Sequence, residues 1–172
     1  GWLGDPDQGF GANQPGGWIY NILPYLEQSA LHDLGSGDTF DQKKTTRAQM
    51  AGTPLSVFNC PTRRRAMTFP NHVDKFNSTT PPQTARGDYA INAGSQPHGR
   101  NRCEFFKGRA VSTIAKGMDP SANWPDASMC NGISYQRSTV TMAHVHDGSS
   151  NTYLAGEKYL NPDHYLTGID YS

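Results

Sequence analysis

The sequence lacks any long apolar run and any excess of charge of one sign. No stretch approaches the roughly 18 consecutive apolar residues that a membrane-spanning helix needs. The 15 Lys and Arg residues balance the 15 Asp and Glu residues, so the formal net charge is zero. Without a positive excess, the chain has no electrostatic basis for binding nucleic acid or lying on an anionic membrane surface. The composition therefore argues against both of these protein classes.

Gly and Pro are frequent, but they do not reach the level of a disordered chain. Together they make up 30 of 172 residues, below the roughly 25–30% that marks low-complexity sequences. Charged residues, at 17%, fall short of the roughly 25% of an average soluble protein. The length suits one domain. We expect a single folded, loop-rich domain over residues 1–172, with a modest core and a weakly charged surface.

The three cysteines, Cys60, Cys103 and Cys130, match no zinc or redox motif in their spacing. An odd number allows one disulfide and one remaining thiol. Two interpretations stay open: three buried small residues, or a single disulfide between Cys103 and Cys130.

The N-terminal part of the chain predicts irregular structure followed by helices. Residues 1–17 are mainly Gly, Pro, Asp and Asn with isolated aromatics, which is typical of irregular structure. Apolar residues then recur at steps of three and four over 18–34, which predicts an amphipathic helix with a kink or restart at Pro24. Residues 38–51 predict a second, polar and exposed helix that ends at Gly52.

Beyond this helical part, which covers residues 18–51, residues 52–172 predict strands and long loops. A proline-rich stretch at 61–87 predicts a surface loop. Short apolar or alternating runs predict strands at 55–59, 88–93, within 104–114, 133–135, 139–144 and 153–159. Because helices come first and strands afterwards, we expect an α+β fold in which the N-terminal helix packs on an antiparallel sheet.

The most chemically suggestive cluster consists of His144, His146 and Glu157. Two histidines at i and i+2 of a strand lie on the same face, and imidazole together with carboxylate suits Zn, Fe, Ni or Cu. A turn at Asp147-Gly148 could bring Glu157 onto the facing strand. The alternative is that both histidines are half-exposed strand residues and that Asp147-Gly148 serves only the turn.

Two further candidate sites lie in predicted loops. Asp5 and Asp7 resemble the start of a calcium loop, whose alternating carboxylates supply hard oxygen ligands. Gly16 stands at the twelfth position, where an EF-hand needs Glu, so only a looser calcium site is left. Asn77, followed by Ser78 and Thr79, fits the acceptor pattern for N-glycosylation.

The sequence contains no convincing catalytic set. It has no Gly-x-Ser-x-Gly motif and no glycine-rich phosphate loop. Cys60 precedes Arg63, Arg64 and Arg65, whose positive charge would favour a reactive thiolate. More often, a cysteine at a strand end is a core residue and such arginines form a solvated turn. We expect no enzymatic activity and no cofactor.

Four stretches of the sequence resemble blocks of a known family, in the family's order. They are GWIYNILPYLEQ at 17–28, VFNCPTRR at 57–64, DYAINAG at 88–94 and DGSSNTYLAGEK at 147–158. The chain resembles the large bacterial family of prepilin-like proteins of unknown function, whose full members carry a type IV prepilin methylation helix and a terminal His-x9-Asp-Gly motif. The resemblance covers about residues 17–159. Both terminal signatures are absent from this sequence, so we expect a piece of a longer protein or a member that assembles differently.

The resemblance implies a secreted or cell-envelope protein with a head domain like that of a pilin or a type II secretion pseudopilin. Such proteins anchor and polymerise through a hydrophobic N-terminal helix, so any membrane contact would need a helix that is absent from this chain. Within the head, side chains of one turn are expected to cap backbone N–H groups. That turn consists of Asp147, Gly148, Ser149, Ser150, Asn151 and Thr152.

We therefore predict a structural subunit, extracellular or associated with the cell surface or periplasm, that assembles with copies of itself. The alternative is a secreted binding module. It would hold a transition metal at the histidine–glutamate cluster, or a carbohydrate stacked on exposed aromatics such as Trp2, Trp18 or Trp124.

Overall fold

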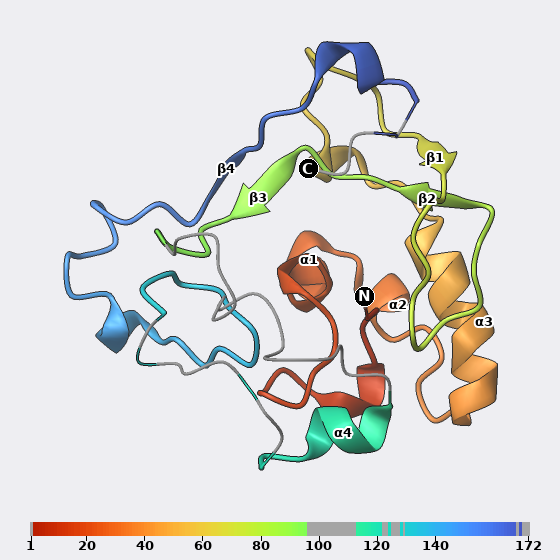
Figure 1. Cartoon of the computed structure of the whole chain (residues 1–172), viewed down its shortest axis with the longest axis horizontal. Coiled ribbons are helices and arrows are strands. Elements are labelled where there is room, and N and C mark those ends of the chain that lie inside the picture. The colour runs from red at the N-terminus through yellow and green to blue at the C-terminus, as the bar shows by residue number, and fades with distance from the viewer. Residues whose placement is uncertain are drawn as a thin grey trace.

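The computed structural model describes residues 2–95, 113–121, 124, 128, 130–167 and 169, and these form an α+β fold (Figure 1). The α-helices are α1 (Trp18–Ile22), α2 (Ser29–His32), α3 (Phe40–Ala51) and α4 (Ile114–Met118). The strands are β1 (Thr68–Pro70), β2 (Gln83–Ala85), β3 (Tyr89–Ile91) and β4 (Ala155–Glu157). Short 3-10 helices lie at Pro6–Gln8, Leu23–Leu26, Ser56–Phe58, Met142–His144 and Pro162–His164.

The strands form two small antiparallel sheets. β1 pairs with β2, with Phe69 opposite Thr84, and β3 pairs with β4, with Ala90 opposite Gly156. The strands predicted at 88–93 and 153–159 are confirmed. β1 and β2 lie inside the proline-rich stretch that predicted only a loop. A two-stranded sheet tolerates Pro70 because each of its strands has a free edge that needs no N–H donor.

The predicted helix over 18–34 is broken into three pieces. α1 runs into the 3-10 helix Leu23–Leu26, with Pro24 in its first turn, and the chain turns at Glu27 with φ 60° before α2 starts. Proline lacks the N–H that a continuous helix would need, which confirms the predicted restart at Pro24.

The predicted helix over 38–51 is confirmed as α3. Thr39 and Gln42 form a capping box at its N-terminus, and Gly52 caps its C-terminus. The expected exposure is wrong, because Lys43 and Arg47 on this helix are 6% and 1% exposed.

The core is small and lies between α1 and the link from β2 to β3 (Figure 1). Tyr20, Leu23 and Phe58 form a buried apolar cluster in it, and Trp18 meets Phe58 edge-on at 5.9 Å. The N-terminal segment passes over the Tyr20 ring, since a Cβ at Gly4 would lie 2.2 Å from a ring carbon. A glycine at this position is what allows the close approach.

Three of the other predicted strands are wrong, and the fourth falls largely outside the described residues. Residues 133–135 are not in a strand, 55–59 contain the 3-10 helix Ser56–Phe58, and 139–144 end in the 3-10 helix Met142–His144. At Thr141 the backbone N–H donates to the His144 ring at 3.0 Å, which is a local alternative to strand pairing. Of 104–114, only the last two residues are described.

Candidate functional site

Two of the family-like blocks meet at a buried ion pair between Arg64 and Asp88. The Arg64 Nε donates to Asp88 Oδ1 at 2.8 Å, and its Nη2 donates to the same oxygen. The other oxygen, Oδ2, accepts the backbone N–H of Cys60 at 2.9 Å. Asp88 is 0% and Arg64 7% exposed. The prediction that the arginines form a solvated turn is therefore wrong for Arg64.

Arg63 and Arg64 also bind a third block, the C-terminal segment that contains β4. Arg64 Nη1 donates to the Tyr165 carbonyl at 3.1 Å, and Arg63 Nη1 donates to the Lys158 carbonyl at 2.8 Å. Arg63 also pairs with the Glu157 carboxylate at 2.9 Å. The arginine pair thus ties together segments that lie up to 101 residues apart. The sequence did not predict that Arg63 and Arg64 join distant segments, because no local sequence pattern indicates partners so far away in the chain.

Cys60 is a buried residue beside the ion pair of Arg64 and Asp88, as the core interpretation predicted. It is free, 6% exposed, and its Sγ lies 3.1 Å from Thr62 Oγ1. Cys130 is disulfide-bonded. Cys103, the partner that the sequence suggested for it, lies outside the described residues, so that pairing stays a prediction.

The predicted calcium ligands, Asp5 and Asp7, bind side-chain cations instead. Asp5 accepts from Lys43 at 2.8 Å and from Arg47 at 2.6 Å, and Lys43 also bonds Asp7. The hydrogen bond from Lys43 holds the pKa of Asp7 below its usual value. Because both carboxylates already neutralise a cation, this arrangement leaves no set of open ligands for Ca²⁺.

The predicted metal ligands do not come together. The described residues contain no group of three His, Cys, Asp or Glu that could hold a metal ion. His144 lies in a 3-10 helix and not on a strand, so it does not share a strand face with His146. Glu157 lies on β4 and pairs with Arg63.

The predicted glycosylation site, Asn77, is completely buried. Its Oδ1 accepts the Leu3 N–H at 2.9 Å and its Nδ2 donates to the Leu3 carbonyl at 2.7 Å. The same residue's carbonyl accepts from Arg47 at 3.1 Å. The amide therefore anchors the N-terminal segment, and the folded chain has no room for a glycan on it. The acceptor pattern carries no information about burial.

The segment 147–152 turns as the sequence indicated, with Gly148 at φ 81°. Backbone bonds run from Gly148 N to the Val145 carbonyl and from Asn151 N to the Gly148 carbonyl. The side-chain bond within the turn differs from the expected one. Asn151 Nδ2 donates to the Asp147 carbonyl at 2.9 Å, so the amide satisfies an acceptor instead of capping an N–H.

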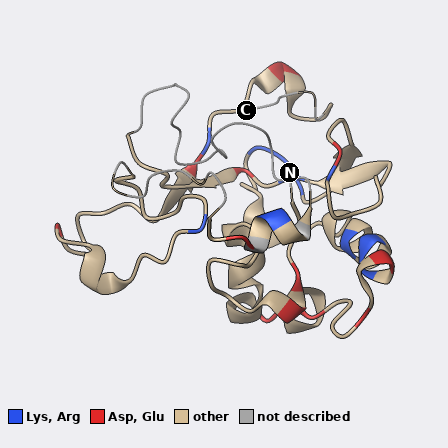
Figure 2. Cartoon of the chain, turned by 60° about the horizontal axis from the view of Figure 1, so that its bottom comes forward, with Lys and Arg blue, Asp and Glu red and all other residues tan. Residues whose placement is uncertain are grey.

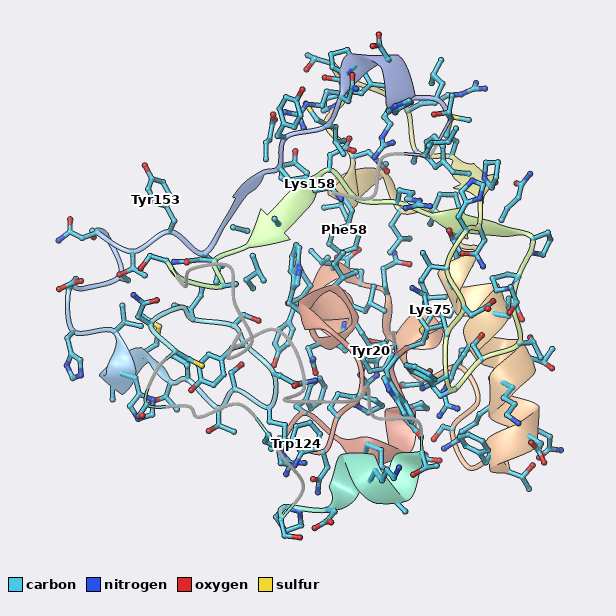
Figure 3. The ribbon with its side chains drawn as sticks, in the orientation of Figure 1. Tyr20, Phe58, Lys75, Trp124, Tyr153 and Lys158 are labelled. Atoms are coloured by element: carbon cyan, nitrogen blue, oxygen red, sulfur yellow. The ribbon has the colours of Figure 1, made fainter. Side chains whose placement is uncertain are left out.

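Large exposed apolar side chains gather in the C-terminal part of the chain. Six of the twelve found among the described residues fall between 142 and 169, and we call these six the C-terminal apolar strip. They are Met142, Tyr153, Leu154, Tyr159, Leu166 and Ile169, with exposed fractions from 45% to 85%. Figure 3 shows Tyr153 pointing away from the body of the molecule. All three residues of β4, which Tyr153, Leu154 and Tyr159 flank in the chain, are exposed.

Two of the three predicted sugar-stacking tryptophans line one cavity. Trp2 and Trp124 border a space of about 110 Å³, where the Arg137 guanidinium lies 4.5 Å from the Trp124 ring centroid. This volume is below the roughly 300–1,000 Å³ of small-molecule sites. Trp18, the third, packs against the core.

The fold and these sites define a small α+β domain held together by buried ion pairs. The chain belongs to a bacterial family described as a protein of unknown function (DUF1559), whose model matches residues 1–171. That description names no activity, ligand or partner. No curated protein and no solved structure matches the chain. Within the described residues, no helix has the length and apolar character to span a bilayer.

Proposed function

We propose that this chain is the head of a structural subunit that assembles with copies of itself at the cell surface or in the periplasm, as pilins and pseudopilins do. The observation that carries the proposal is the open edge of β4, which is flanked by Tyr153, Leu154 and Tyr159 of the C-terminal apolar strip. Large apolar side chains exposed close together on a domain surface commonly mark a protein–protein contact. The likeness of the sequence blocks to prepilin-like proteins supports the same function.

The edge of β4 offers free hydrogen-bonding groups. Asn92 N–H donates to the Leu154 carbonyl, and Lys158 N–H donates to the Asp88 carbonyl, so these bonds join β4 to β3. In an antiparallel ladder the groups alternate in direction. Ala155 and Glu157 therefore turn their N–H and C=O groups to the side away from β3, and no described strand pairs there.

A second copy of β4 fits this edge. If two β4 strands pair antiparallel about a two-fold axis at Gly156, Ala155 of one copy meets Glu157 of the other and supplies their missing hydrogen bonds. The same register places Tyr153 opposite Tyr159, and an aromatic pair across strands is stabilising. A Cβ at Gly156 would meet nothing within 4 Å, so the axis is open to a neighbour.

The charge distribution supports self-association. Figure 2 shows charges of both signs together on α3 and a ribbon that is otherwise mostly uncharged. With a net charge of zero, two copies experience little overall repulsion.

A cysteine placed on the axis tests the pairing. In this register the two Gly156 Cα atoms form a non-hydrogen-bonded pair about 4.5 Å apart, within disulfide reach. We expect Gly156→Cys to form a covalent dimer under oxidising conditions. The control is Tyr25→Cys, at a side chain that is 81% exposed and outside the strip.

Sedimentation of the unmodified chain completes the test, because it reports association without an added cysteine. We expect a reversible, concentration-dependent dimer. A chain that remains monomeric at the highest attainable concentration, with Gly156→Cys cross-linking no faster than Tyr25→Cys, would rule out the β4 contact.

A further inference from the structure

A second cavity, of about 360 Å³, opens beside the core. This volume lies within the range of small-molecule sites. Its walls are mainly apolar and come largely from α1, α2, α3 and the 3-10 segments. Among them are Trp18, Ile19, Leu23, Leu31, Met50 and Phe58. One cation, Arg86, also lines the cavity.

Within the described part of the chain, Arg86 has no counter-ion. Its Nε is buried and lacks a hydrogen-bond partner, and no carboxylate within the described residues pairs with its guanidinium. Lys75, which is half-buried, likewise has no carboxylate partner in that part of the chain. Burial, followed by the positive charge of Arg86, lowers the pKa of Lys75, although Lys75 itself does not line the cavity.

The lysines and arginines that are fully buried in the described ranges are, by contrast, all paired. Lys43 and Arg47 bond Asp5, and Arg64 bonds Asp88. In a chain of zero net charge, Lys75 and Arg86 therefore give a local positive charge that no described carboxylate neutralises. Partly buried cations without a partner are unfavourable, and a bound anion would remove that cost.

We propose that this cavity binds a small amphiphile, an apolar chain with one anionic head group. The chain would lie against the apolar wall and the head would meet Arg86, with Lys75 adding positive charge to that end of the site. Figure 3 shows Lys75 between α1 and α3, on the same side of the link from β2 to β3 as Tyr20. The site lies on different residues from the β4 edge, so it stands independently of the proposed assembly.

Calorimetric titration of the purified chain tests the charge requirement. The probes are decanoate, decyl phosphate and decan-1-ol, each below its aggregation concentration. We expect the anions to bind one per chain and at least about tenfold more tightly than the alcohol, since hydrogen bonds to charged groups contribute this much. Whichever of decanoate and decyl phosphate binds with the higher affinity identifies the preferred head group as carboxylate or phosphate.

Two charge-removing variants and one control locate the head group. We expect Arg86→Gln to weaken anion binding by about tenfold or more and to leave decan-1-ol binding unchanged. Lys75→Gln serves the same purpose if Arg86→Gln fails to fold. Arg65→Gln, at an exposed arginine away from the cavity, should bind as the unmodified chain does.

Thermal unfolding gives an independent measure. A ligand that binds only the folded state raises the melting temperature, so decanoate should raise that of the unmodified chain more than that of Arg86→Gln. The proposal is overturned if no probe binds, if decan-1-ol binds as tightly as both anions, or if removing either cation leaves anion affinity unchanged.

Discussion

Replacing Asp88 by Asn removes the charge that neutralises Arg64 while it preserves the size of the side chain. Asp88 is 0% and Arg64 7% exposed, so water cannot replace the lost interaction. Removing one partner of a buried ion pair costs about 3–5 kcal/mol. The Asn oxygen still accepts the Cys60 N–H, which places the expected loss near the lower limit, at about 3 kcal/mol.

Urea unfolding followed by circular dichroism measures this loss by linear extrapolation. For a chain of this length, a loss of about 3 kcal/mol lowers the melting temperature by roughly 6–12 °C. Asp41→Asn is the matched control, because its pair with Lys44 is at the surface, where Asp41 is 86% exposed. That variant should lose less than about 1 kcal/mol.

Hydrogen exchange separates a local from a global effect of Asp88→Asn. Arg64 also donates a hydrogen bond to the Tyr165 carbonyl. Amides near Tyr165 should therefore exchange faster in the variant than in the unmodified chain, even under conditions chosen so that the two chains have the same free energy of unfolding. A free energy of unfolding within about 1 kcal/mol of the unmodified chain would refute the claim that this pair fastens the C-terminal segment.

The core and the N-terminal ion pairs give two more predictions on stability. Leu23→Ala, at a core residue that is 3% exposed, should cost about 2–5 kcal/mol in urea unfolding, and a loss below about 1 kcal/mol would show that the core does not depend on it. The hydrogen bond from Lys43 lowers the folded-state pKa of Asp7 below its ordinary value of 3.8. The stabilisation that this bond gives the folded chain is therefore complete above pH 3.8 and is lost as the pH falls through the lowered pKa. The free energy of unfolding should therefore fall on acidification, and Lys43→Met should reduce the slope. An unchanged slope would contradict the pairing.

The parts of the fold that were predictable depend on local signals. The stop at Gly52 and the break at Pro24 act within a few residues of themselves, and each lies where the sequence indicated. The two strands β3 and β4 were also recognisable from their composition. Their pairing with each other was not, because Ala90 and its partner Gly156 lie far apart in the sequence.

The parts that were not predictable depend on distant partners. Arg64, Asp88 and Asn77 are polar, and composition alone places such residues at the surface. Each is buried because a partner far away in the sequence satisfies it: Asp88 pairs with Arg64, 24 residues away, and Asn77 bonds Leu3, 74 residues away. Glu157, from the candidate metal site, likewise pairs with a residue far away in the sequence, Arg63.

Electron microscopy of the native material from the cell surface, with mass spectrometry to identify this chain in it, tests the proposed assembly most directly. We expect a regular fibre or surface array that contains the chain, and we expect Tyr153→Lys, which places a charge opposite Tyr159 of the next copy, to disrupt it. Discrete monomeric particles, or an assembly unchanged by that substitution, would contradict assembly through the β4 edge.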